Sequence, residues 1–178
     1  MCAQEPYWMK TYTIKTESGK IMKKISTNVS RTIQTKLVLP PDTNHLDTIF
    51  GGKVLAYIDE IAAIAAMKHS RKVVVTASID EVNFLSAAKV GDILTLEGVV
   101  ISTGNTSMEV YVKVECEQLE TGVKSLTTTS FLTMVAIDSD GKPVPVPGII
   151  PETDHEEELY QQAKERRKRW LHVNKGMK

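Results

Sequence analysis

One predicted helix in the middle of the chain has apolar side chains on every side, rather than on a single face. Residues 53–70 contain no proline or glycine and are rich in alanine and isoleucine, a composition that favours a helix. The apolar side chains recur on every side of it: Val54, Leu55, Ile58, Ile61, Ala62, Ile64, Ala65, Ala66 and Met67. Because a helix that is apolar all round is usually buried, we expect other elements of the chain to wrap around it.

Alternating apolar and polar residues predict five β-strands around this helix. One strand precedes the helix at residues 32–39 and is stopped by Pro40 and Pro41, because proline has no N–H to donate to a sheet. Four strands follow the helix, at residues 73–84, 93–102, 107–117 and 125–137. Short turn segments join these four strands, so we predict an antiparallel meander with the first strand as a fifth member.

One long buried helix against one curled antiparallel sheet is an α+β arrangement called the hot-dog fold, in which the five-stranded sheet wraps around the helix. We assign residues 31–142 to this domain and residues 1–30 to a peripheral N-terminal arm. Residues 143–178 begin with a proline-rich linker that is too poor in N–H donors for a central strand. They continue into a charged helix at 152–172, acidic at its start and basic at its end, which complements the helix dipole.

The charge balance and the cysteine count exclude some classes of partner. The 178 residues include 22 lysines and arginines and 22 aspartates and glutamates, so no net basic field attracts nucleic acid, and local groups must hold any anionic substrate. Residues 1–10 lack a signal peptide's apolar segment, and no window approaches the roughly 20 apolar residues of a membrane span. We therefore expect a cytoplasmic protein with no membrane partner, in which Cys2 and Cys116 are reduced thiols.

Several common catalytic motifs are absent from the sequence. Gly51 and Gly52 form a lone doublet without the GxGxxG or GxxxxGK[ST] pattern of nucleotide-binding loops. No GxSxG segment marks a serine hydrolase, and the four histidines and two cysteines lack the spacing of a metal site. We expect no metal and no cofactor, which leaves the polar loop and helix start at residues 42–60 as the candidate site.

Two features of this segment could serve chemistry. Gly51 and Gly52 at a helix start would leave free amide N–H groups that suit a developing oxyanion, although the glycines could instead only permit a sharp entry into the helix. Asp59 lies among apolar neighbours, where a carboxylate needs a structural partner or a catalytic task because burying it unpaired costs several kcal/mol. The adjacent Glu60 could be the buried carboxylate instead, since the two side chains point about 100° apart.

The distance between these features implies more than one subunit. Eight residues of helix separate Gly51 from Asp59 by roughly 12 Å, whereas each group must come within about 3 Å of the same carbonyl. If both are catalytic, the helix start of one subunit must meet Asp59 of another. We therefore predict a homo-oligomer that is at least a dimer.

The same residues resemble a known family. The segment Pro41-Asp-Thr-Asn-His-x-x-Thr-x-Phe-Gly-Gly, followed after five residues by Ile58-Asp-Glu-x-Ala, resembles the signature of bacterial hot-dog acyl-CoA thioesterases of the YciA/YkhA type. That family includes the mammalian cytosolic brain acyl-CoA hydrolase. The similarity runs from about Ser30 to Pro143 and includes Val75-Thr-Ala-Ser, Asn83-Phe, Val90-Gly-Asp and Thr106-Ser-Met-Glu-Val.

The resemblance implies an enzyme that hydrolyses acyl-CoA thioesters to free acid and coenzyme A. In the family, the acidic residue at the position of Asp59 acts with an asparagine from a facing subunit or domain, which Asn44 matches. The resemblance thus implies Asp59 as general base for water, or alternatively as nucleophile, and Asn44 as the group that holds the water. Asn44 could also only bond its own loop, as asparagine before a turn often does. The amides of Gly51 and Gly52 would stabilise the oxyanion. The residues implied to bind substrate or coenzyme A are Thr43, His45, Phe84, Gly104, Thr106 and Ser107.

The phosphates of coenzyme A need cations, and the sequence offers several. Residues 104–107 resemble the family turn that lines the coenzyme site, but this chain has Asn105 where many members have arginine, which weakens a phosphate contact there. The other candidates are Lys68, His69, Arg71 and Lys72 after the central helix and the basic run at 166–169 in the C-terminal helix. Either run could also be only a solvated face.

Two other functions fit these residues less well. Dehydratases of hydroxyacyl thioesters resemble one another in an aspartate–histidine pair, and Asp42 and His45 are too close and wrongly placed to form it. A non-catalytic acyl-CoA or nucleotide-binding regulator remains the alternative, although it would need neither Asn44 nor Asp59. Hot-dog dimers usually join two sheets edge to edge, and the resemblance further implies a trimer of such dimers, that is, a hexamer.

Overall fold

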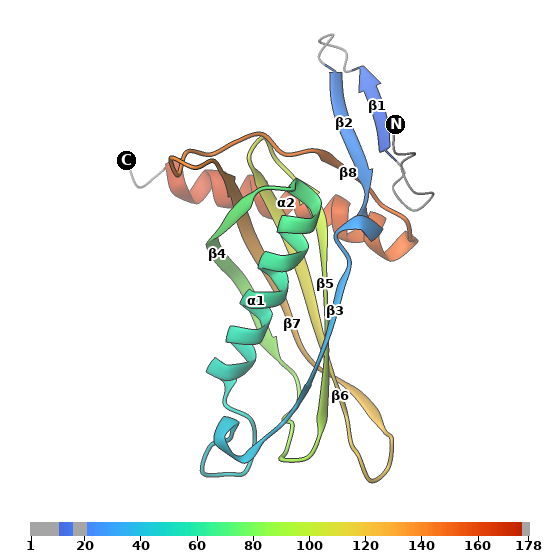
Figure 1. The fold of residues 1–178 in the computed structure, drawn as a ribbon, viewed down its shortest axis with the longest axis vertical. Helices are drawn as coiled ribbons and strands as arrows, with labels where there is room; N and C mark the ends of the chain where they lie inside the picture. Colours follow the sequence, from blue (N-terminus) through green and yellow to red (C-terminus); the bar gives the residue numbers. More distant parts are fainter. Residues whose placement is uncertain (1–10, 16–20, 176–178) are drawn as a thin grey trace, which may run out of the picture.

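The computed structural model describes residues 11–15 and 21–175, and the chain folds around one large antiparallel sheet (Figure 1). The helices are α1 (Gly51–Ser70) and α2 (Asp154–Lys175), with the short 3-10 helices η1 (Thr27–Val29) and η2 (Pro40–Asp42). The strands are β1 (Thr11–Lys15), β2 (Ile21–Ser26), β3 (Thr32–Leu37), β4 (Val73–Phe84), β5 (Ile93–Thr103), β6 (Ser107–Glu117), β7 (Lys124–Ile137) and β8 (Gly148–Ile150). Both predicted helices and all five predicted strands are present, and the predicted α+β class is confirmed.

The strand order of the five-stranded sheet differs from the predicted meander. The sheet runs β3-β5-β6-β7-β4, so only β5, β6 and β7 form a meander. β4 pairs with β7 instead of β5, and β3 takes the place beside β5. The connection at residues 85–92 is long enough to cross the end of the sheet, whereas the shorter turns at 104–106 and 118–123 keep the next strands adjacent. β4 is therefore an edge strand.

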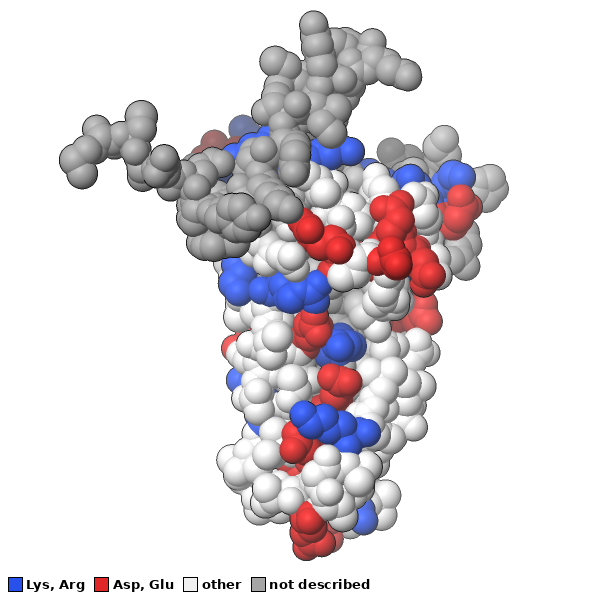
Figure 2. Space-filling view, turned by 90° about the vertical axis from the view of Figure 1, so that its right-hand side faces the viewer, with Lys and Arg blue, Asp and Glu red and all other residues white. Residues whose placement is uncertain are grey.

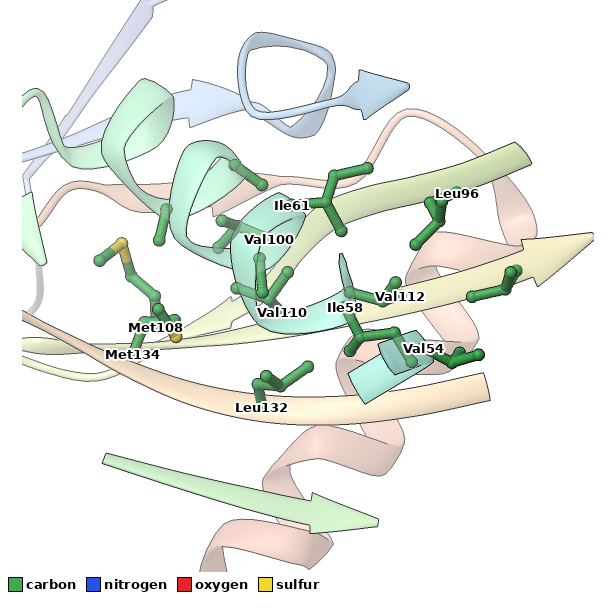
Figure 3. Packing of buried hydrophobic residues seen from close by; sticks show 14 of the residues in the cluster. Val54, Ile58, Ile61, Leu96, Val100, Met108, Val110, Val112, Leu132 and Met134 are labelled. Atoms are coloured by element: carbon green, nitrogen blue, oxygen red, sulfur yellow. The ribbon is translucent and has the colours of Figure 1, made fainter. Parts of the chain in front are cut away.

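Helix α1 packs one face against the five-stranded sheet and forms the main core. In Figure 3 the helix side chains Val54, Ile58 and Ile61 lie against side chains of the sheet: Leu96, Val100, Val110, Val112, Leu132 and Met134. The far side of α1 is less well covered, since Met67 is 40% exposed. The predicted wrapping of the whole helix is thus incomplete in one chain, because a single sheet can cover only one side of a cylinder.

The C-terminal segment folds onto the main domain. The proline-rich stretch does not run as a free linker, because Val146 and Ile149 are buried in the core beside α1. β8, which the sequence did not predict, pairs in parallel with β2, and β2 also pairs with β1. Helix α2 lies on the five-stranded sheet through an apolar cluster: Val99 and Ile101 of β5, and Leu159 and Ala163 of α2.

A buried carboxylate fixes the start of α2. Glu156 is 3% exposed, accepts a hydrogen bond from the Thr27 hydroxyl at 2.6 Å and pairs with the guanidinium of Arg31. Arg31 also pairs with Glu97 of β5. These contacts join η1, β5 and α2, so they fix the start of the C-terminal helix against the sheet.

Charges of both signs alternate over the side of the molecule shown in Figure 2. On the neighbouring strands β5 and β6, the Lys113 ammonium lies 3.1 Å from Glu97 and 3.8 Å from Glu115. Surface ion pairs of this kind contribute little stability, but the two opposite charges of each pair neutralise one another. The described residues on this side therefore form no broad basic surface, in agreement with the balanced composition.

Candidate active site

The loop before α1 is fixed to that helix through Asp42. One carboxylate oxygen lies 2.9 Å from the Lys53 ammonium, and the other accepts a hydrogen bond from the Tyr57 hydroxyl at 3.3 Å. The backbone carbonyl of Asp42 accepts a further hydrogen bond from the Phe50 N–H at 2.9 Å. The Asp42 carboxylate also raises the pKa of Lys53, which keeps this cation charged. Asp42 is therefore a structural anchor that sets the position of the helix start.

The side chain of Asn44 organises the loop. Its Oδ1 accepts a hydrogen bond from the Leu46 N–H at 2.8 Å, and its Nδ2 donates one to Thr48 Oγ1 at 3.0 Å. The Asn44 N–H donates to the Thr48 carbonyl at 2.9 Å, and between them Asp47 adopts the left-handed conformation with φ of 56°. Within the described part of one chain, Asn44 thus bonds its own loop and makes no hydrogen bond to Asp59.

Gly51 and Gly52 lie at the start of α1, as the sequence predicted. Phe50 precedes the helix without a side-chain cap, and the amides of Gly51 and Gly52 donate no hydrogen bond within the described residues. A Cβ on Gly51 would lie 3.3 Å from the Phe84 ring, so glycine lets that ring approach the backbone closely. Two unbonded amides at the positive end of a 20-residue helix suit an anionic ligand atom.

Asp59 lies in the middle of α1 and has a partner on β4. Its Oδ1 accepts a hydrogen bond of 2.6 Å from the Thr76 hydroxyl, and its Oδ2 has no donor among the described residues. Asp59 is only partly buried, so the cost of a fully buried carboxylate does not arise. Thr76 was not among the predicted site residues, because a threonine in a strand of valines is a common structural choice.

Glu60 does not take the place of Asp59. It is exposed, accepts a hydrogen bond from Gln34 at 3.2 Å and lies 3.6 Å from the Lys36 ammonium of β3. Of the two acidic neighbours on α1, Asp59 therefore faces β4 and Glu60 faces β3.

The other residues predicted to bind substrate are spread over the chain. Near the helix start, Thr43 donates its hydroxyl to the Pro40 carbonyl, His45 is exposed, and the half-exposed Phe84 covers Gly51. The turn that contains Gly104 is at the opposite end of the sheet, the end at which β4 begins rather than the end at which it finishes. The 12 residues of β4 span roughly 36 Å, so one chain does not bring the two regions together.

The residues near the end of α1 that were candidates to bind the phosphates of coenzyme A differ in their contacts. His69 cannot serve as one of them, because it is 1% exposed and burial lowers its pKa, so the ring is neutral near pH 7. Its Nε2 donates to the Pro147 carbonyl at 2.9 Å. Lys68 donates to the Arg31 carbonyl at 3.3 Å, whereas Arg71 and Lys72 are exposed.

The C-terminal helix brings two arginines to the outer face of the sheet. Arg166 lies 2.5 Å from a carboxylate oxygen of Glu109 and 4.0 Å from the centre of the Phe131 ring. Burial raises the pKa of Glu109, and the Arg166 guanidinium opposes that rise. Arg167 lies directly against Gly104, where any Cβ would overlap its guanidinium.

Metal and membrane sites are not evident in the described residues. No three histidine, cysteine, aspartate or glutamate side chains in that part of the chain are grouped as metal ligands would be. None of the described helices is both long and apolar enough to cross a membrane. Cys116 is buried beside Asp92, and burial raises the pKa of its thiol to about 11, which keeps it protonated and unreactive; Cys2 lies outside the described residues.

Comparison with known proteins identifies the family. Residues 46–123 match the Thioesterase superfamily. The uncharacterized acyl-CoA thioester hydrolase YkhA of Bacillus subtilis is 50% identical over 147 residues, which are 80% of this chain and 86% of YkhA. The cytosolic acyl coenzyme A thioester hydrolase of Rattus norvegicus is 33% identical over 132 residues, 73% of this chain but only 35% of that protein.

Solved structures share the fold. A hexameric acyl-CoA thioesterase in its apo form has a TM-score of 0.80 at 64% identity, over 81% of this chain and 92% of the other. The acyl-CoA hydrolase of Staphylococcus aureus was solved with butyryl coenzyme A, coenzyme A and coenzyme A disulfide. It has a TM-score of 0.77 at 42% identity, over 85% of this chain and 95% of that protein. Alanine variants of its asparagine, aspartate and threonine have also been solved. The chain belongs to the Thioesterase superfamily and, within it, to the hot-dog acyl-CoA thioester hydrolases.

Proposed function

We propose that this protein hydrolyses acyl-CoA thioesters to a free acid and coenzyme A. The observation that carries the proposal is the 2.6 Å hydrogen bond by which Thr76 holds the Asp59 carboxylate on a helix whose first two amides are unbonded. Attack of water on a thioester requires two groups. One is a carboxylate that can accept a proton from the water, and the other is a pair of N–H donors for the oxyanion.

The reaction follows from these groups. Thr76 holds Asp59 through Oδ1, which leaves Oδ2 to accept a proton from water as the water oxygen attacks the thioester carbonyl carbon. The amides of Gly51 and Gly52 of a facing subunit donate to the carbonyl oxygen as it gains negative charge, because those of the same helix are too far from Asp59. The carbon–sulfur bond then breaks, and the departing thiolate of coenzyme A takes up the proton that Asp59 accepted from the water. Asn44 of the facing subunit orients the water through its side-chain amide.

The variants of the Staphylococcus aureus enzyme support this choice of residues. Its replaced asparagine and aspartate are 15 positions apart, and its aspartate and threonine are 17 positions apart. Asn44, Asp59 and Thr76 are separated by the same intervals in this chain. The same three residue types at the same two spacings favour a site made of these three side chains.

We infer that each site is shared between subunits. Gly51 and Asp59 are roughly 12 Å apart along one helix, and Asn44 bonds its own loop, so a partner must complete the site. The edge strand β4 exposes Val73, Val75 and Ile79, an apolar edge that pairing with a second copy would cover. The hexameric relative supports assembly of three such dimers.

The remaining expectations follow the same assignment. We take residues 31–142 as the thioesterase domain, acyl-CoA as the small-molecule partner, and the cytoplasm as the place of reaction, which the name of the rat relative supports. Hydrolysis without a metal or other cofactor remains a prediction.

The activity is tested by measuring thiol release from acetyl-, butyryl-, octanoyl- and palmitoyl-CoA. We expect hydrolysis of at least one of these thioesters, and the chain-length profile then defines the acyl group that the site accepts. If the protein binds coenzyme A but releases no thiol from any of them, the hydrolase assignment is wrong and a regulator that binds acyl-CoA takes its place.

Thr76 gives a second prediction. Thr76→Val removes the hydroxyl but keeps the shape of the side chain, so Asp59 loses its orienting donor, and we expect kcat to fall by about 10- to 100-fold. Thr76→Ser keeps a hydroxyl and should retain more than about a third of the activity. Steady-state kinetics with matched thermal unfolding checks this. A Thr76→Val enzyme as fast as the wild type would show that the hydrogen bond has no part in catalysis.

A further inference from the structure

Two β-bulges interrupt the edge strand β4 directly after Thr76. The pairing of β4 with β7 shifts by one residue at Ala77 and again at Asp80, so each of these residues is extra in its strand. A bulge disrupts the regular ladder and turns the neighbouring side chains, and bulges are common beside active sites for that reason. The two bulges therefore decide which β4 side chains lie next to Thr76 on the side of the sheet that faces α1.

Ile79 lies on that side of the sheet. Residues that pair across two antiparallel strands point to the same side, and Thr76 pairs with Met134 and Ile79 with Leu132. Both β7 residues belong to the core that packs against α1. Ile79 is thus the residue that follows Thr76 on the helix side of β4.

A regular strand would place polar side chains there instead. Side chains alternate along a strand, so Ser78 and Asp80 would follow Thr76 on the helix side if β4 had no bulges. The bulges turn Asp80 to the outer side, where the Thr133 hydroxyl donates a hydrogen bond to it at 2.8 Å. They leave the apolar Ile79 beside the residue that holds the catalytic carboxylate.

Helix α1 leaves this part of β4 open. Three apolar side chains of β4 lie on the helix side after Thr76: Ile79 is 42% exposed, Val82 is half-buried and Phe84 is 53% exposed. The β7 residues paired with these three are all buried. We call the three residues the β4 strip. It begins two residues of β7 beyond Thr76, which is roughly 7 Å, and ends at the Phe84 ring beside Gly51.

The chemistry proposed for the site indicates what lies on the β4 strip. Water activated by Asp59 attacks the thioester carbonyl carbon, so this carbon must lie close to Asp59. The acyl chain is bonded to the same carbon and therefore starts there. Ile79 is an open apolar side chain next to Thr76, which holds Asp59. An acyl chain that lies against it is stabilised because apolar surface of both leaves water.

Pairing of β4 with a second copy of the chain is compatible with an acyl chain on the strip. Such pairing extends the sheet in its own plane through backbone hydrogen bonds, whereas the side chains point away from that plane. The Ile79 side chain would stay on the helix side. The second copy would screen the strip from water along its open edge.

We propose that the β4 strip binds the acyl chain of the substrate and that Ile79 determines which chains fit. This inference rests on the proposed function, because it takes an acyl-CoA thioester as the ligand and places its carbonyl carbon at Asp59. The preferred substrates are then thioesters whose acyl group reaches Ile79. Octanoyl-CoA should bind more tightly than acetyl-CoA, whose acyl group ends one carbon after the carbonyl.

The test measures binding by calorimetry of coenzyme A and of S-octyl-coenzyme A, a thioether that cannot be hydrolysed. Ile79→Trp places a larger ring where the chain lies, so the affinity for S-octyl-coenzyme A should fall at least about 10-fold relative to that for coenzyme A. Ile79→Thr keeps the branched shape but adds a hydroxyl that the chain would bury, and the same ratio should fall about fivefold or more. The control is Ile33→Trp, the same change at a 63% exposed isoleucine of the other edge strand β3, which should leave the ratio unchanged.

Hydrolysis should change in the same sense as binding. For Ile79→Trp, the ratio of kcat/KM for octanoyl-CoA to that for acetyl-CoA should fall about 10-fold. The proposal is overturned if the ratio of the two affinities stays at the wild-type value. It is also overturned if both affinities fall equally, because the coenzyme arm would then lie on the strip.

Size-exclusion chromatography of the two Ile79 variants tests the remaining occupant, a second copy of the chain. If both variants dissociate the assembly, the strip is part of the subunit interface and the proposal is wrong; if only Ile79→Trp does, Ile79→Thr decides. Because binding is measured without turnover, the expected change in binding together with no hydrolysis by the wild type would refute the hydrolase assignment alone. Hydrolysis together with an unchanged affinity ratio would refute the acyl-chain proposal alone.

Discussion

Asp59→Ala will lower kcat for acyl-CoA hydrolysis by about 100-fold or more, because a positioned general base contributes a factor of 10² to 10⁴. Asp59 is the carboxylate that Thr76 holds in place, and alanine leaves no group that can accept the proton of the attacking water. Asp59 is partly exposed and lies outside the main core cluster, so the variant should keep the fold and the oligomeric state of the wild type. Thiol release and size-exclusion chromatography measure the two quantities.

Glu60→Ala is the matched control for this prediction. Glu60 is the adjacent acidic residue on α1, but it is exposed and faces Gln34 and Lys36 instead of Thr76. Its removal should change kcat by less than about threefold, since exposed ion pairs contribute little. Asp59→Asn separates charge from shape: it keeps the size of the side chain but cannot act as a base. An Asp59→Asn enzyme with more than a tenth of wild-type activity would exclude the general-base role.

The elements of the fold were predictable because their signals are local. The 18 residues without glycine or proline before Arg71 define α1, and prolines or glycines mark the ends of most strands. The position of β4 was not predictable, because its pairing with β7 joins residues between 44 (Phe84 and Thr128) and 64 (Val73 and Ile137) positions apart and leaves no local pattern. β8 escaped prediction for a related reason, since three residues after a proline-rich stretch are too short to alternate.

Some residues of the candidate site could likewise be predicted from the sequence, and others could not. Asp59 could be found from sequence because a carboxylate interrupts an otherwise apolar helix, and Gly51 and Gly52 because a glycine doublet before a helix is unusual. Thr76 could not be found in this way, because a threonine is an ordinary residue in a strand. Its significance comes from its hydrogen bond to Asp59, which lies 17 positions away.

Mixing two inactive variants will restore activity if Asn44 and Asp59 come from different subunits. Asn44→Ala and Asp59→Ala should each be nearly inactive when assembled alone. Co-expressed in equal amounts, the two chains assemble at random, and a site is intact when its asparagine comes from one variant and its aspartate from the other. That combination occurs in about a quarter of the sites, so activity should recover to roughly 25% of the wild type.

The control is a mixture of the two variants after each has assembled separately, which should stay inactive as long as subunits do not exchange. A site contained in one chain predicts a different result, because every chain in the mixture lacks one of the two residues and no site can be complete. The single chain favours the shared arrangement, since Asn44 bonds Thr48 and Leu46 of its own loop while Asp59 faces Thr76 of β4. Recovery of activity would therefore show that assembly creates the site, and no recovery would place both residues in one subunit.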